Sequence, residues 1–226
     1  MRDRVLEADG LCAGYGSVAA IVDVNLHLEQ GEMVGLLGAN GAGKTTTLLA
    51  LVGAIRPTGG KVSLFGYLDQ RPVFRRVRDG LALLAEQRTV FMGLTVRENL
   101  LLGRGDPQVA LELFPELEQR LKVRAGLISG GEQQMLALAR ILAARPKLVL
   151  ADELSLGLAP LVVHRLLQAL SEAADAGAGV IIVEQHPHTA LRWTDRAYVM
   201  RRGRIELAGN SAELLERADE VTALYL

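Results

Sequence analysis

The sequence predicts an α/β fold in which most strands of the core sheet run parallel. Three short runs are apolar from end to end, as strands buried on both faces are: Met33–Leu37, Leu148–Ala151 and Gly179–Val183. Helical patterns occur after the first two runs, at Thr46–Val52 and Leu161–Ala174. Strands that alternate with helices in this way are typical of a parallel sheet covered by crossover helices.

The remaining strands are expected to be antiparallel. Val5–Leu11 and Ile21–Leu28 alternate in part between apolar and polar residues, which predicts an N-terminal antiparallel subdomain, and Lys61–Phe65 is another predicted strand. Near the other end, Arg196–Met200 and Arg204–Leu207 predict a strand pair across a turn, followed by a helical C-terminus.

A helical segment is expected between the two halves of the core. Thr95–Leu102 and Val109–Leu121 predict two amphipathic helices, because a glycine- and proline-containing break separates them. A longer helical pattern runs from Glu132 to Ala144. We therefore expect one domain over residues 1–226, with a core at 1–94 and 131–226 that includes the antiparallel part, and a small helical subdomain at 95–130.

Composition limits the kinds of partner. The chain has 226 residues, a formal net charge of −1 and one cysteine, Cys12, which excludes an internal disulfide and favours a reducing, cytosolic compartment. A net charge near zero gives no support to nucleic-acid binding. No run approaches the roughly 20 apolar residues of a transmembrane helix. The basic stretch Arg71–Arg78 is interpreted as a solvated face, with a partner or lipid headgroups as the alternative.

The segment Gly38–Thr45 matches the phosphate-binding pattern G-x-x-x-x-G-K-[ST] in full and lies between a buried strand and a helix. Its glycines let backbone N–H groups face phosphate oxygens, and the helix N-terminus favours negative charge. Lys44 is expected to reach the β- and γ-phosphates of a nucleotide, and the Thr45 hydroxyl to bind Mg²⁺. The alternative is a glycine-rich turn without a ligand. The predicted nucleotide-binding residues are Gly38, Asn40, Gly41, Ala42, Gly43, Lys44, Thr45 and Thr46.

Two carboxylates close the second buried strand. Asp152 is predicted to hold Mg²⁺ through water, and Glu153 to polarise the water that attacks the nucleotide. The alternative for such an acidic pair is a helix N-cap or a surface turn.

A third motif identifies a family resemblance. Ile128–Gln134 reads Ile-Ser-Gly-Gly-Glu-Gln-Gln and resembles the signature motif of ATP-binding-cassette (ABC) ATPases. Together with the two motifs above, it extends the resemblance to this family over essentially the whole chain. The resemblance implies a P-loop ABC ATPase fold, with ATP and Mg²⁺ as ligands. It also implies a nucleotide-sandwich dimer, in which Ser129, Gly130, Gly131 and Glu132 of one subunit cover the ATP held by the other.

Other residues of this chain resemble individual functional positions of the family. Tyr15 resembles the aromatic residue that stacks on adenine, with a buried structural tyrosine as the alternative. Ser155–Leu158 resembles the loop that contacts the opposite subunit.

The chain departs from the family pattern near the γ-phosphate. Glu86 stands where the family has a glutamine that reaches Mg²⁺ and the attacking water, with Gln87 as its neighbour, and a carboxylate is a competent ligand. Gln185 stands at the switch-histidine position, with His186 one residue later. Gln185 can donate a hydrogen bond but cannot carry a proton at neutral pH. Leu154 replaces the usual proline, and the helical lobe is shorter than usual.

Four features resemble one branch, the ATPase subunits of branched-chain amino-acid importers: Glu86, Val183-Glu184-Gln185, Met135-Leu136-Ala137 after the signature motif, and Ser155–Pro160. The resemblance implies an ATP-hydrolysing subunit at the cytoplasmic face of the membrane, paired with a second ABC ATPase as a homodimer or heterodimer. It further implies permease subunits and, indirectly, a substrate-binding protein, with no nucleic acid. A slow or non-hydrolysing regulatory subunit, and the ATPase of a urea or lipid transporter, remain the alternatives.

Overall fold

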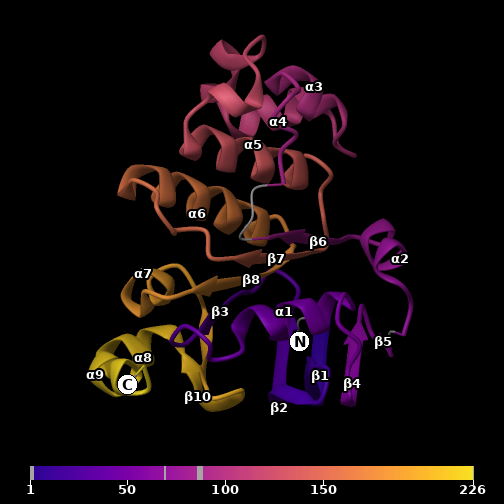
Figure 1. Ribbon diagram of the computed structural model, residues 1–226. Helices are drawn as coiled ribbons and strands as arrows, with labels where there is room; N and C mark the ends of the chain where they lie inside the picture. Colours follow the sequence, from indigo (N-terminus) through magenta and orange to yellow (C-terminus); the bar gives the residue numbers. More distant parts are fainter. Residues whose placement is uncertain (1–2, 69, 86–88, 226) are drawn as a thin grey trace.

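The computed structural model describes residues 3–68, 70–85 and 89–225, and within them the strands form two sheets (Figure 1). The smaller sheet is antiparallel and has the order β2-β1-β4-β5. The core sheet has the order β10-β9-β3-β8-β7-β6, and all its neighbouring strands pair parallel except β10 with β9. The strands are β1 (Arg4–Tyr15), β2 (Val18–Glu29), β3 (Met33–Leu37), β4 (Gly59–Leu64), β5 (Tyr67–Leu68), β6 (Leu81–Leu84), β7 (Leu148–Asp152), β8 (Gly179–Glu184), β9 (Arg196–Arg201) and β10 (Arg204–Asn210).

Helices cover both faces of the core sheet. The first helix, α1, lies between the core sheet and the antiparallel sheet, while α5 and α6 cover the other face and α3 and α4 lie beyond α5 (Figure 1). The helices are α1 (Lys44–Val52), α2 (Val73–Arg78), α3 (Val96–Leu101), α4 (Pro107–Leu113), α5 (Gly130–Leu142), α6 (Pro160–Asp175), α7 (Pro187–Leu191), α8 (Ser211–Glu216) and α9 (Ala218–Ala223), with 3₁₀ helices at Pro115–Arg120 and Ala125–Leu127. No helix among the described residues combines the length and the apolar character needed to cross a membrane.

Neighbouring residues of the central strands point into two different hydrophobic cores. Val180 and Ile182 of β8 pack in the core that contains α5 and α6. Ile181 and Val183 pack in the core that contains α1 and the antiparallel sheet. Both faces of the strand are therefore buried, which explains its uninterrupted apolar sequence.

The predicted parallel sheet, N-terminal antiparallel sheet and C-terminal strand pair are confirmed. The single helix expected over Val109–Leu121 is wrong, because α4 ends at Leu113 and a 3₁₀ helix begins at Pro115. Phe114, between them, has φ −134° and ψ 77°, since the residue before a proline is disfavoured in the α region. The strand β6 and the helix α7 were not predicted.

The basic stretch Arg71–Arg78 contains the short helix α2. Arg75 and Arg78 are exposed, as expected of a solvated face. The same interpretation is wrong for Arg76, whose buried guanidinium donates a 2.9 Å hydrogen bond to the carbonyl of Leu51 near the end of α1. This arginine satisfies a carbonyl in the last turn of a helix.

Candidate nucleotide site

The loop from Gly38 to Gly43 joins β3 to α1 and is pressed closely against its surroundings. Gly38 has φ 149°, and a Cβ atom there would lie 2.4 Å from the carbonyl oxygen of Met200 on β9. Gly43 has φ 105°, and its Cβ would lie 2.8 Å from a methyl group of Ile21. These two positions therefore require glycine, and the loop is built from backbone rather than from side chains.

Lys44 is the first residue of α1, and its ammonium group points back into the loop. The side chain is buried, and Nζ donates hydrogen bonds to the carbonyl oxygens of Gly38 (2.8 Å) and Ala39 (3.1 Å). The Nζ atom also lies 3.9 Å from Oε1 of Glu153. Burial lowers the pKa of Lys44, against the opposing charges of Glu153, Asp152 and Glu184. The cation is thus held by groups that a phosphate could replace.

The two predicted carboxylates lie where β7 ends. Asp152 is the last residue of that strand and is buried, while the Glu153 side chain is 12% exposed. Glu153 has φ 48°, which is uncommon for a residue with a side chain, and its N–H donates a 3.0 Å hydrogen bond to the carbonyl of Val183. The alternative of a helix N-cap does not hold, because Ala159 is the N-cap of the following helix α6. The strained backbone instead turns Glu153 toward Lys44.

The donors near the loop suit Mg²⁺. The Asp152 carboxylate acts on Lys44 electrostatically, so the two groups share one region, and the exposed Thr45 follows Lys44 on the first turn of α1. Carboxylate and hydroxyl oxygens are the hard ligands that Mg²⁺ prefers, so the residues present fit the ion. Glu86, the third predicted ligand, lies outside the described residues.

A further acidic residue, which the sequence reasoning missed, lies at the end of β8. Glu184 is 1% exposed, and its carboxylate accepts hydrogen bonds from the backbone N–H and the hydroxyl of Ser155. Burial raises the pKa of Glu184 above its ordinary value, against the Ser155 hydrogen bonds. The contact ties the loop after Glu153 to the strand that leads into Gln185. The available sequence signal was a charged residue ending an otherwise apolar run.

The predicted signature residues form the start of α5. Ser129 is the N-cap, since its hydroxyl accepts a 3.2 Å hydrogen bond from the N–H of Glu132, and the Glu132 carboxylate accepts a 2.7 Å bond from the N–H of Ser129. Glu132 also pairs with Arg120 at 2.7 Å, and this hydrogen bond holds the pKa of Glu132 below its ordinary value. The helices α5 and α1 pack on opposite faces of the core sheet, so one chain does not bring Ser129–Gly131 to the phosphate loop (Figure 1).

The remaining predicted residues are Tyr15 and the pair Gln185-His186 at the switch position. Tyr15 ends β1 and is 57% exposed, which excludes a buried structural tyrosine. Gln185 is half-buried directly after β8, while His186 is exposed at the start of α7. The structure therefore brings together Lys44, Asp152 and Glu153, and it leaves Ser129–Gly131 at a distance.

Comparison with known proteins identifies the family of the chain. The family described as ABC transporter matches residues 21–155. The chain is 42% identical to the high-affinity branched-chain amino acid transport ATP-binding protein BraG of Pseudomonas aeruginosa, over 93% of this chain and 95% of that one. It is 34% identical to the lipopolysaccharide export system ATP-binding protein LptB of Haemophilus influenzae, over 98% of this chain and 97% of that one.

A solved structure of the ATP-binding subunit of an ABC transporter superposes with a TM-score of 0.83 at 30% identity, covering 97% of this chain and 98% of the other. The matched fold confirms the predicted α/β class. The chain therefore belongs to the ABC transporter family, as one of its ATP-binding, ATP-hydrolysing subunits.

Proposed function

We propose that this chain binds Mg²⁺ and ATP at Gly38–Thr45 and hydrolyses the ATP to drive a branched-chain amino-acid importer. The observation that carries the proposal is the 3.9 Å approach of Lys44 to Glu153, which puts the phosphate-binding cation beside the carboxylate that would act on water. Thr46 and the loop backbone from Gly38 to Gly43 complete the phosphate contacts, and exposed Tyr15 is available to stack on adenine. Mg²⁺, bound through Asp152, Thr45 and Glu86, would neutralise charge on the phosphates.

Hydrolysis follows from what these side chains can do. On nucleotide binding, the Lys44 ammonium group donates to phosphate oxygens in place of the carbonyls of Gly38 and Ala39. This exchange also frees the Glu153 carboxylate from its contact with Lys44. Glu153 then polarises the attacking water, and Gln185 donates a hydrogen bond to the γ-phosphate. Glu184 holds Ser155, and through it the loop that carries Glu153.

The ATP site is proposed to be shared between two subunits. The signature helix α5 starts away from the phosphate loop of its own chain, and the positive end of its helix dipole is suited to a phosphate. Three exposed leucines lie beside the elements that would meet a partner: Leu127 (77% exposed), Leu156 (55%) and Leu161 (81%). Covering these side chains would favour association, so ATP held by Lys44 of one chain is closed over by Ser129 and Gly131 of another. The second subunit is a copy of this chain or a paired ATPase.

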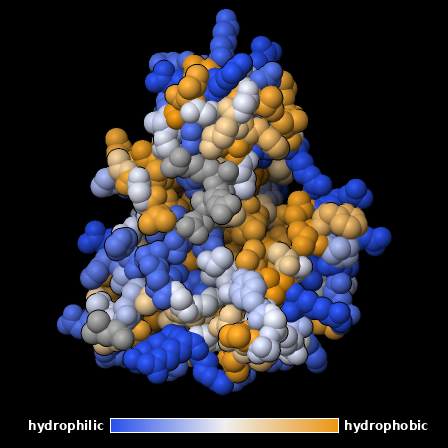
Figure 2. Space-filling view, viewed as in Figure 1, coloured by the Kyte–Doolittle hydropathy of each residue, from blue (hydrophilic) through white to orange (hydrophobic). Residues whose placement is uncertain are grey.

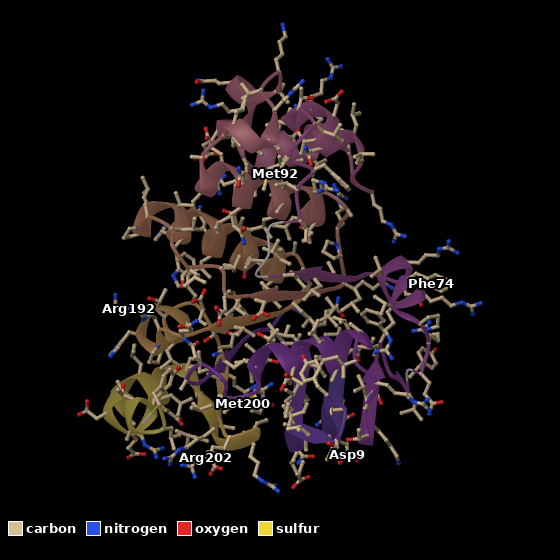
Figure 3. The ribbon with its side chains drawn as sticks, viewed as in Figure 1. Asp9, Phe74, Met92, Arg192, Met200 and Arg202 are labelled. Carbon is tan, nitrogen blue, oxygen red and sulfur yellow. The ribbon has the colours of Figure 1, made fainter. Side chains whose placement is uncertain are left out.

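The helical subdomain expected at residues 95–130 is proposed to take part in docking the chain to its permease subunits. A hollow of about 450 Å³ lies between α2, β6, α5 and the segment that follows α3. Figure 2 shows apolar side chains gathered in this region, and Phe74 points outward from α2 in Figure 3. The exposed apolar residues nearby are Phe74, Phe91, Met92, Leu101 and Leu102. We propose that permease subunits dock here, which places the chain at the cytoplasmic face of the membrane, with a substrate-binding protein acting indirectly on the other side.

The proposed substrate rests on similarity. The higher identity to BraG than to LptB, and Val183-Glu184-Gln185 in place of a switch histidine, support branched-chain amino acids over lipid export. The substrate itself does not touch this subunit, so the test is to purify the chain with its membrane subunits and reconstitute them in vesicles. We expect ATP hydrolysis to rise with a binding protein loaded with Leu, Ile or Val. Stimulation by urea or by lipopolysaccharide alone would instead support one of the alternatives.

A slow or non-hydrolysing regulatory subunit is the second candidate. Gln185 supports it, because a glutamine cannot carry the proton that the switch histidine carries. Steady-state ATPase assays of the purified chain, alone and with its paired ATPase, separate the two. A rate that comes entirely from the paired chain would support the regulatory role.

A further inference from the structure

The phosphate loop is tied to the C-terminal end of the chain. The backbone N–H of Gly38 donates a 3.0 Å hydrogen bond to the hydroxyl of Tyr225, although 187 residues separate the two. Gly38 is the first residue after β3, so this hydrogen bond is made where the strand passes into the phosphate loop. Leu224 and Tyr225 follow α9 in the C-terminal part of the chain (Figure 1), and they line one hollow together with Ala39–Ala42 of this loop.

We propose that Tyr225 is a positioning residue for the phosphate loop and sets nucleotide affinity by holding the loop at Gly38. The proposal rests on the proposed ATP site at Gly38–Thr45. Tyr225 does not touch the nucleotide, and its effect passes through the backbone of Gly38.

Gly38 is confined on three sides. Its Cα lies against the carbonyl of Met200, where a Cβ would come within 2.4 Å, and Figure 3 places Met200 on β9 below α1. Its own carbonyl accepts the 2.8 Å hydrogen bond from Lys44. The tyrosine bond to its N–H and the lysine bond to its C=O therefore act on the same residue. A shift of Gly38 moves the acceptor that orients Lys44.

The hydroxyl of Tyr225 stays uncharged at neutral pH, so it can accept this hydrogen bond. Burial raises the pKa of Tyr225 to about 12. A hollow of about 230 Å³ adjoins the contact and is lined by Asn40, Gly41, Arg202 and Leu224 among others. Because this space borders the loop, loss of the hydrogen bond leaves the loop room to move.

The same contact joins the two loops that would meet the phosphates. Tyr225 follows α9, whose Val221 is fully buried, and α9 packs against α7. Helix α7 begins at Pro187, two residues after Gln185. A displacement of the switch position is thereby linked through α7 and α9 to the start of the phosphate loop.

The test compares Tyr225→Phe, which removes only the hydroxyl, with Tyr67→Phe, the same change at a 75% exposed position on β5. Calorimetric titration with ADP and steady-state ATP kinetics give the affinity, KM and kcat, and thermal unfolding without nucleotide gives stability. We expect Tyr225→Phe to raise the Kd for ADP and the KM for ATP about 3- to 10-fold, with kcat near the parent value and only a small fall in the melting temperature. Tyr67→Phe is expected to match the parent throughout.

Hydrogen exchange supplies a readout that a general loss of stability would not reproduce. In the nucleotide-free protein, amides of the Gly38–Gly43 loop are expected to exchange faster in Tyr225→Phe, while those of α6 do not change. Parental affinity in Tyr225→Phe, or faster exchange across the whole chain, would overturn the proposal and leave the proposed function standing. A parent protein that does not bind ADP would overturn both.

Discussion

The ammonium group of Lys44 lies 3.9 Å from a carboxylate oxygen of Glu153 and donates to the carbonyls of Gly38 and Ala39. The ammonium and carboxylate groups in these contacts are the ones proposed to bind phosphate and to polarise water. In the proposed mechanism, a phosphate entering the loop would replace the carbonyls as the partner of Lys44 and leave Glu153 free to act on water. The contact therefore describes a resting arrangement that ATP binding would undo.

Removing this cation tests the phosphate contact. Lys44→Ala is expected to weaken ATP binding by about 10- to 100-fold, because a hydrogen-bonded charge on the phosphates is lost. Fluorescent-nucleotide titration measures the effect. Lys61→Ala, a change at an exposed lysine on β4, is the matched control. Equal affinity in Lys44→Ala and the control would show that the loop does not hold the phosphates through Lys44.

Neutralising the proposed catalytic carboxylate should separate binding from hydrolysis. Glu153→Gln is expected to lower kcat by about 10²- to 10⁴-fold while ATP affinity is retained, because an amide cannot accept the proton of the attacking water. Steady-state phosphate release and nucleotide titration give the two quantities. Glu206→Gln on β10, at an exposed position, controls for the loss of one negative charge. Hydrolysis at the parent rate in Glu153→Gln would remove Glu153 from the mechanism.

Two capping boxes in the chain allow a matched test of the signature serine. Ser129 caps α5 with Glu132, and Thr95 caps α3 with Glu98 in the same hydrogen-bond pattern. Ser129→Ala and Thr95→Ala should each cost about 1 kcal/mol of folding stability, measured by urea unfolding. Only Ser129→Ala is expected to weaken ATP-dependent association in light scattering. Equal association of both variants would argue against a role for Ser129 across the interface.

The buried Glu184 predicts a pH dependence of stability. Because burial raises its pKa above the ordinary value of 4.5, the folded protein takes up a proton before the unfolded chain as pH falls. The stability associated with the protonated group is present below 4.5 and is lost as pH rises through the folded-state pKa. Glu184→Gln resembles the protonated form and keeps an acceptor for Ser155. The free energy of unfolding of Glu184→Gln, measured in urea, should therefore exceed that of the parent by more near about pH 8 than near about pH 5.

The control for this experiment is Glu206→Gln, which removes a carboxylate from an exposed position. It is expected to give the same difference from the parent at both pH values. A difference for Glu184→Gln that does not change with pH would contradict the assignment of the buried charge.

The extent to which the sequence predicts the structure depends on how local the signal is. The strands β3, β7 and β8 are buried on both faces, so their apolar runs identify them directly. The loop at Gly38–Thr45 and the pair Asp152-Glu153 follow from motif spacing, and the structure places Lys44 beside Glu153. Pro115 was the available sign that the helix over Val109–Leu121 would be interrupted.

Other features depend on contacts between distant residues. The strand β6 has four residues, and neither its sequence nor its length distinguishes it from a turn of helix. The bond from Gly38 to Tyr225 spans 187 residues, and that from Ser155 to Glu184 joins a loop to a strand end. Hydrophobic periodicity carries no information about such pairs. The proposed shared ATP site would require a second subunit, whose position hydrophobic periodicity within one chain does not give.

The central claim is that each ATP site combines Lys44 of one subunit with Ser129 of another. The most direct test mixes Lys44→Ala with Ser129→Ala and measures steady-state ATP hydrolysis. Each variant alone lacks an intact site, whereas half of randomly formed dimers contain one complete site out of two. We expect the mixture to recover about a quarter of the parent rate. A mixture no more active than the separate variants would contradict a site shared between two copies of this chain.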